Sequence, residues 1–196
     1  MRNIYIILIL IFSFTIISCA KKSDTSSTTT TTTELEGTWV TNCYASGSSY
    51  YIQTVIVSGT DISHKNEQHT DSSCSTDNGT WIETYSSLSI GDNVTFVSGS
   101  TGHYFSVAIS TFTYTPNLAS DVTTMNDDAW CSFSDWTINT EKDYTGKTCG
   151  STSYPVANTT YLGLYMLVGN NLFLGDFSST GSYPTSVYTS IPLVKQ

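Results

Sequence analysis

The stretch YLGLYMLVGNNLFLGDF, residues 161–177, is the most informative part of the sequence for the fold. Two runs rich in apolar and aromatic residues, 161–168 and 172–177, flank the tripeptide Gly169-Asn170-Asn171. Gly and Asn tolerate the positive φ angles that a tight hairpin turn requires. The stretch therefore predicts two antiparallel strands joined by a short turn, and similar patterns occur along most of the chain.

Further strand patterns lie on both sides of this hairpin, each bounded by Gly, Asn, Asp or Ser. They cover residues 38–45, 50–58, 61–70, 80–88, 93–98, 103–115 and 129–139. Residues 61–70 are polar and predict an exposed strand, whereas residues 183–193 contain Pro184 and Pro192 and predict a final strand at an edge. No stretch after residue 34 has sustained helical periodicity. We expect an all-β domain of eight to ten short antiparallel strands, closed as a barrel or folded as a two-sheet sandwich.

Charge and length set limits on function and domain number. The 196 residues carry 16 acidic against 7 basic side chains, a net charge of −9. From Glu34 onward there are four lysines and no arginine against 15 acidic side chains, which excludes nucleic-acid binding through a basic patch. Residues 34–196 are enough for one domain that buries about 70% of its unfolded surface.

The N-terminus predicts a signal peptide over residues 1–18. Arg2 and Asn3 form a short polar head, and residues 4–17 are almost wholly apolar. Fourteen helical residues span about 21 Å, less than the ~30 Å hydrocarbon core of a bilayer. The segment is therefore typical of a cleaved signal peptide rather than of a transmembrane helix.

Ile16-Ile17-Ser18-Cys19 resembles the lipobox of bacterial lipoproteins. The resemblance implies cleavage before Cys19 and acylation of both its sulfur and its new amino group, so that the membrane is a partner through this lipid anchor. Ala20 stands where enteric lipoproteins of the inner membrane carry Asp. By the same resemblance, the expected location is the outer membrane.

Residues 19–33 are expected to form the acylated cysteine and a disordered tether. Ser or Thr occupies ten of the eleven positions 23–33, and no apolar residue interrupts them. Such a segment cannot bury enough apolar surface to offset the entropy of ordering. The predicted β-barrel domain then covers residues 34–196.

Leu35-Glu36-Gly37-Thr38-Trp39 resembles the Gly-x-Trp motif that opens the first strand of lipocalins and related calycin barrels. The resemblance implies that Gly37 allows close packing at the barrel base and that Trp39 fills the closed end. Lipocalins stack a late arginine on this tryptophan, whereas this chain has no arginine after Arg2. We therefore expect a lipocalin-like barrel outside the core family, with the strand 183–193 covering Trp39.

Four cysteines remain after Cys19, which is an even number in an exported chain and predicts two disulfides. Three connectivities are possible, and proximity in sequence favours Cys43–Cys74 and Cys131–Cys149. Zinc is a poor alternative because no two of these cysteines have the C-x₂₋₄-C spacing of zinc modules.

The sequence offers few candidates for chemistry, and we expect no enzyme, no cofactor and no metal. His64, His69 and His103 are interpreted as solvated surface residues. There is no G-x-S-x-G motif to expose a serine nucleophile. Asp121 and residues 126–128 are expected to be solvated turn residues rather than a calcium loop. Glu83 shares a strand face with Trp81 and Tyr85, but a glycosidase would require a second carboxylate that the sequence does not identify.

Two functions remain open from the sequence. One is a non-catalytic binding barrel for a small lipophilic ligand, consistent with 13 Tyr, 8 Phe and 4 Trp. The other is a structural or adhesive surface lipoprotein that contacts a protein or glycan through its outer face. An internal cavity of about 300 Å³ or more favours the first function, and a filled interior favours the second.

Overall fold

The computed structural model describes residues 33–96, 99–177 and 181–196. The predicted signal peptide, the lipobox with Cys19 and the tether up to residue 32 lie outside these ranges, so the structure does not bear on them. Within the described ranges no helix is both long enough and apolar enough to cross a membrane.

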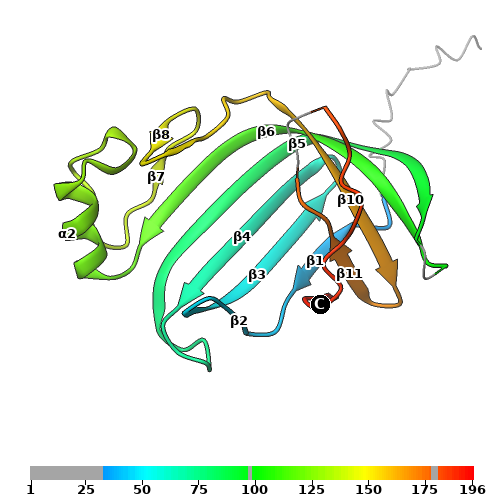
Figure 1. Cartoon of the computed structure of the whole chain (residues 1–196), viewed down its shortest axis with the longest axis horizontal. Helices are drawn as coiled ribbons and strands as arrows, with labels where there is room; N and C mark the ends of the chain where they lie inside the picture. Colours follow the sequence, from blue (N-terminus) through cyan, green and yellow to red (C-terminus); the bar gives the residue numbers. More distant parts are fainter. Residues whose placement is uncertain (1–32, 97–98, 178–180) are drawn as a thin grey trace, which may run out of the picture.

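Eight antiparallel strands form a closed barrel, which confirms the all-β prediction and selects the barrel over the sandwich. Around the ring they are β1 (Gly37–Val40), β12 (Leu193–Lys195), β11 (Asn171–Leu174), β10 (Thr160–Val168), β6 (Thr101–Pro116), β5 (Asp77–Thr95), β4 (Asp61–His69) and β3 (Ser49–Ser58). Pairing of β1 with β3 closes the ring, and β2 (Tyr44–Ser46) and β7 (Lys142–Asp143) extend it (Figure 1). A separate pair, β8 (Thr148–Cys149) and β9 (Thr152–Ser153), lies beyond it.

The predicted hairpin is confirmed as β10 and β11. Val168 pairs with Asn171, so the turn itself consists of Gly169 and Asn170. Gly169 has a φ of 59°, a conformation that residues with a Cβ rarely adopt. The second strand ends at Leu174, three residues earlier than predicted.

The structure differs from the predicted pair of strands at 80–88 and 93–98, of which residues 97–98 lie outside the described ranges. Residues 80–95 all belong to β5, a single strand of 19 residues that pairs with both β4 and β6. Its register against β6 shifts at three places, including one between Ser86 and Ser89, where Ser87 has a φ of 59°. The polar turn signals in this stretch therefore mark β-bulges, which bend a strand and increase its twist without ending it.

Residues 129–139 form no strand, so that prediction is wrong. The helix α2 (Ala119–Asp127) precedes a 3₁₀ turn, Trp130–Ser132, and an irregular segment. Ala129, Cys131 and Ser132 all have positive φ angles, which are incompatible with an extended strand. The alternation of Trp130, Ser132, Ser134 and Trp136 suggested a strand, whereas α2 has no fully buried residue and only Val122 and Met125 pack against the core, too few for a clear helical pattern.

Two other boundaries also differ. Residues 38–45 divide into β1 and β2 across Thr41, Asn42 and Cys43. Of the predicted final strand 183–193, only Leu193 belongs to β12. Prolines at 184 and 192 cannot donate to a strand ladder, which is consistent with a loop over most of this segment.

Trp39, on β1, is 2% exposed and packs in the end of the barrel that we call the closed end. Its indole Nε1 donates a hydrogen bond to the carbonyl of Leu35 over 2.7 Å. Lys195, near the end of the chain, places its Nζ 4.9 Å from the centre of the ring. Gly37 has a φ of 118°, and a Cβ there would lie 3.4 Å from the Lys195 side chain. The covering residue thus belongs to β12, two positions beyond the predicted segment.

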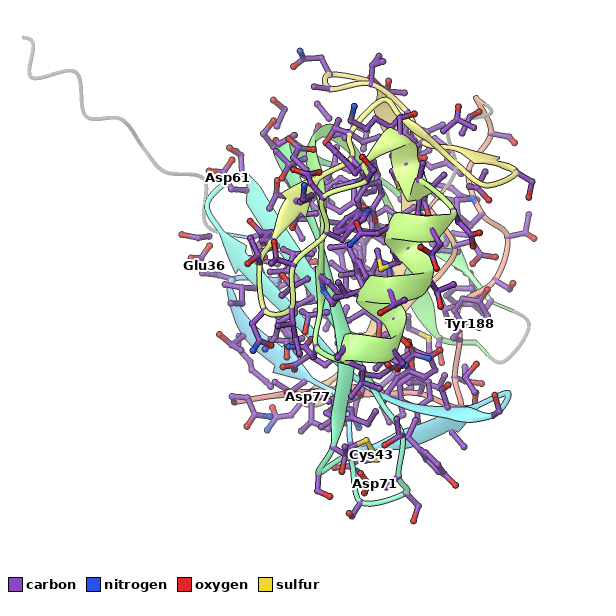
Figure 2. All side chains as sticks on the ribbon, turned by 90° about the vertical axis from the view of Figure 1, so that its left-hand side faces the viewer. Glu36, Cys43, Asp61, Asp71, Asp77 and Tyr188 are labelled. Atoms are coloured by element: carbon purple, nitrogen blue, oxygen red, sulfur yellow. A yellow bond between two sulfur atoms is a disulfide. The ribbon has the colours of Figure 1, made fainter. Side chains whose placement is uncertain are left out.

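The opposite, open end carries α2, β7 and the β8–β9 pair (Figure 1). Figure 2 views the molecule from this side, with α2 foremost and Cys43, Asp71 and Asp77 together at one margin. Both predicted disulfides, Cys43–Cys74 and Cys131–Cys149, are confirmed. They cross-link loops at this end of the barrel.

Candidate functional site

The barrel interior is filled at the closed end. Apolar side chains from β3, β4, β6, β11 and the segment just before β1 meet there, and the space left between them is about 20 Å³. That volume accommodates about one water molecule. Its lining includes Leu35, Val55, Val57, Phe105 and Leu172. This half of the barrel is a solid core.

The open half of the interior holds a cavity of about 270 Å³, which we call the interior cavity. Its lining is aromatic and polar and consists of Tyr51, His64, Asn66, Trp81, Glu83, Tyr144 and Tyr154. His64 borders both this cavity and the small space at the closed end. The boundary between the filled and the hollow half therefore lies at His64.

Strand alternation explains why these residues share the interior. On β4, Ile62, His64 and Asn66 fall on one face, since successive strand residues point to opposite sides. His64 pairs with Glu83 of β5, and Asn66 pairs with Trp81. The β4–β5 register thus brings a histidine beside a carboxylate and an amide beside an indole.

Glu83 is the carboxylate of the interior cavity. Burial opposes its charge, but the neighbouring His64 and the Tyr85 hydroxyl outweigh that effect and hold the pKa of Glu83 below its usual value. Tyr85 donates a hydrogen bond of 2.6 Å to Oε2 of Glu83, and His64 Nδ1 lies 3.4 Å from the same oxygen. The His64 contact is within ion-pair distance but lacks hydrogen-bond geometry. Glu83 is therefore ionised and has room for another donor.

Several buried polar atoms around the cavity have no hydrogen-bond partner within the described chain. They include both ring nitrogens of His64 and Oδ1 of Asn66. A buried polar group without a partner costs about 1–3 kcal/mol, so such atoms normally pair with a ligand or with water. Donors and acceptors in the cavity wall are thus available to a bound molecule.

Tyr144 and Tyr154 complete the cavity wall from the segment after β7. The backbone N–H of Tyr144 donates to the carbonyl of Phe112 over 2.9 Å, which fixes its position against β6. The two tyrosine rings meet edge to face at 4.6 Å. Burial, followed by neighbouring charges that include Glu83, raises the pKa of both hydroxyls, so they remain neutral donors.

A second pocket of about 260 Å³ lies between α2 and the ends of β5 and β6, and we call it the α2 pocket. It is lined by Trp81, Tyr114, Asp121, Thr124, Met125, Asp128 and Trp130. Tyr114 packs in the space above Gly79, where a Cβ would come within 2.2 Å of its hydroxyl oxygen. Trp81 borders both the α2 pocket and the interior cavity.

The histidine interpretation needs correction. His69 is buried, with Nδ1 3.1 Å from Asp77 Oδ1, and His64 lines the interior cavity, so neither is a solvated surface residue. His103 stacks on Tyr165 at 5.2 Å and is partly exposed. The polar composition of residues 61–70 concealed the fact that one face of this strand is enclosed.

The structure brings some of the other candidate residues into the interior cavity and places the rest elsewhere. Trp81 and Glu83 share the cavity wall, whereas Asp121 and residues 126–128 belong to α2 and its C-terminal cap rather than to a turn. Within the described chain, no group of three or more His, Cys, Asp and Glu side chains could hold a metal ion. Sequence reasoning missed Asn66, Tyr144 and Tyr154. For Asn66, the alternation with Ile62 and His64 was the available signal.

No model of a known protein family matches the chain, and no curated protein is similar to it in sequence. Function is therefore inferred from the geometry of the barrel and its pockets.

Proposed function

We propose that this chain is a non-catalytic binding barrel that holds a small lipophilic molecule carrying a hydrogen-bonding group. The interior cavity supports the proposal, because it combines aromatic walls with polar atoms that have no partner in the described chain. Trp81 and the tyrosines suit the lipophilic part, and Glu83, His64 and Asn66 suit the polar group. Its volume of about 270 Å³ lies just below the roughly 300–1,000 Å³ of small-molecule sites, which restricts the site to a small ligand.

The proposal includes a lipocalin-like architecture and a location at the outer membrane. Lys195 lies over Trp39, where lipocalins place an arginine, and this supports the architecture. The lipobox at Cys19 supports acylation and anchoring. Cys19→Ala should then shift the protein from the membrane fraction to the soluble fraction, and a variant that stays in the membrane contradicts the anchor.

The lining of the interior cavity favours binding over catalysis. Glu83 is its one carboxylate among the described residues, whereas glycoside hydrolysis uses two carboxyl groups about 5–10 Å apart. The neighbouring histidine does not face a serine or cysteine nucleophile in this lining. The residues present can hold a molecule by stacking and hydrogen bonding.

A ligand search with matched variants tests the binding function. Full-length protein is purified from its own membranes in a non-ionic detergent, extracted, and analysed by mass spectrometry for co-purified small molecules. Glu83→Gln removes the cavity charge at nearly constant shape, and Glu67→Gln makes the same change on β4, where Glu67 pairs with Lys65 at 2.9 Å. We expect a compound that is retained by Glu67→Gln and depleted in Glu83→Gln. Equal retention by both variants contradicts the proposed site.

A surface lipoprotein that contacts a protein or glycan is the second candidate. Exposed aromatic side chains in the segment before β12 favour it, since Tyr188 is 53% exposed and Tyr183 is 40% exposed. These residues border a shallow pocket with Asp176 and Pro184. Loss of partner binding in Tyr188→Ala, with an unchanged interior cavity, would support this function over the first.

A further inference from the structure

The α2 pocket has aromatic walls on three sides. Tyr114 is central, with the Trp81 ring 4.6 Å away at an angle of 36° and the Trp130 ring 5.6 Å away at 72°. Rings inclined in this way leave a concave space rather than a stack. Met125 adds a polarisable sulfur to the lining.

Two carboxylates, Asp121 and Asp128, also line the α2 pocket. No lysine, arginine or histidine of the described chain forms an ion pair with either of them. The nearby lysines are engaged elsewhere, since Lys142 pairs with Asp135 and both Lys142 and Lys147 lie over Phe133. The pocket therefore has negative charge with no cation of its own.

The helix itself increases this negative potential. Asp128 caps the C-terminal end of α2, where the last turn carries no basic residue. The C-terminal end of a helix has a partial negative charge that favours cations, so an acidic cap there is locally unfavourable. Burial raises the pKa of the Tyr114 hydroxyl to about 12, and the negative charge of Asp121 contributes to this shift.

We propose that the α2 pocket binds an organic cation with a methylated ammonium group. Aromatic faces attract such a cation through their quadrupoles, and the two carboxylates supply the opposite charge. This site shares only Trp81 with the interior cavity, so the inference does not depend on the proposed function.

The lining discriminates among cations. A calcium ion takes six to eight oxygen ligands, and much of this lining is aromatic carbon and thioether. A primary ammonium group needs acceptors for three N–H donors, whereas a methylated ammonium needs few or none and fits an apolar wall. An anionic group attached to the cation would approach Asp121 and Asp128 and be repelled.

Choline is the probe, with 3,3-dimethylbutan-1-ol as its uncharged analogue of the same shape. Each is titrated into the full-length protein in a non-ionic detergent, and binding is followed by calorimetry and by the tryptophan fluorescence of the α2 pocket. We expect saturable choline binding at one site and binding of the neutral analogue weaker by about tenfold or more. Phosphocholine should bind more weakly than choline, which would indicate a free cation rather than a phosphocholine lipid head group as the natural source.

Substitutions in the α2 pocket test whether choline binds there. Asp121→Asn preserves shape and should weaken choline binding about threefold to tenfold, and Trp130→Leu should weaken it by at least about tenfold. Glu83→Gln alters only the interior cavity and should leave choline binding unchanged. Far-UV circular dichroism checks that each variant is folded. If Trp130→Leu does not fold, the result for Asp121→Asn decides the test.

Three results would overturn the inference. Equal affinity for choline and its neutral analogue would show a merely apolar pocket. Displacement of choline by calcium at equal concentration would show a metal site. Loss of choline binding in Glu83→Gln, with Asp121→Asn unaffected, would place the cation in the interior cavity.

Discussion

The two ends of the barrel differ in the side chains that line them and in the free space that they enclose. The closed end consists of interlocked apolar side chains around Trp39 and leaves about 20 Å³ of space. The open end contains a cavity of about 270 Å³ with Glu83 and His64 in its wall and has disulfides in its loops. The densely packed and the hollow parts of the interior are thus separated along one barrel.

The difference indicates how a small barrel can keep a hollow, polar end. An unfilled space forfeits dispersion contacts, and buried polar atoms without partners are costly. Cross-links at the open end compensate by restricting the unfolded chain, with loops of 31 and 18 residues between the paired cysteines.

Trp39→Ala should have the largest effect, because it truncates a large side chain that is 2% exposed. Truncation of a buried Trp typically lowers the free energy of unfolding by about 3–5 kcal/mol, a large share of the 5–15 kcal/mol of a typical domain. Val40→Ala, at the half-buried neighbouring position, is the control and should be mild. Urea unfolding followed by circular dichroism measures the midpoint of both variants. An unchanged midpoint for Trp39→Ala would contradict the predicted role of Trp39 at the closed end.

Removal of the Cys131–Cys149 disulfide should have the next largest effect. Replacing both cysteines with alanine opens an 18-residue loop and should lower the free energy of unfolding by about 3 kcal/mol. Hydrogen exchange should show the loss of protection concentrated in α2 and residues 130–154, with β6 near Phe105 still protected. A uniform loss of protection throughout the barrel would contradict the idea that this disulfide stabilises the open end alone.

Adding one methylene group should lower the free energy of unfolding at the filled closed end but not in the interior cavity, which has free space. In Gly163→Ala the new Cβ would lie 2.2 Å from Cζ of Phe105, and such overpacking typically costs about 1–3 kcal/mol. Gly91→Ala is the control, because its nearest neighbour would be 3.5 Å away. Asn66→Gln enlarges a side chain in the interior cavity and should be nearly neutral. Equal destabilisation by Gly163→Ala and Asn66→Gln would argue against the division.

The smallest expected effect is the acid dependence of Glu83. Its pKa in the folded protein lies below the ordinary value of 4.5, so ionised Glu83 adds stability above about pH 4.5. That contribution is lost as the pH falls through the folded pKa. The difference in urea midpoint between the wild type and Glu83→Gln should therefore shrink between pH 5 and pH 3. A difference that grows in this range would mean that the pKa is raised.

The closed end was largely predictable from the sequence. The Gly-Asn turn at 169–170 and the apolar alternation of Phe105, Val107 and Ile109 carry local signals for turn, strand and core, whereas the role of Gly37 and Trp39 at the barrel base stays a prediction. The disulfide pairing was also predictable, because proximity in sequence selected the correct connectivity. These features depend on neighbours in the chain, which a single sequence displays.

The open end was harder to predict because its residues meet only in the folded barrel. Trp81 and Glu83 lie on one predicted strand, but Tyr144 and Tyr154 reach them from an irregular segment some 60–70 positions later. The left-handed conformations at Ala129, Cys131 and Ser132 give no signal from those residue types. A polar strand such as β4 also resembles a solvated one until the ring of strands encloses one face.

A chemical-shift map of the full-length protein with a small ligand shows which end of the barrel binds it. The probe is 1-aminoanthracene, a lipophilic ring system with one hydrogen-bonding amino group, added in a non-ionic detergent. We expect saturable shifts at His64, Asn66 and Glu83 and none at Trp39, Val57 or Leu172. Shifts centred on the closed end, or none at the interior cavity at saturating probe, would contradict it.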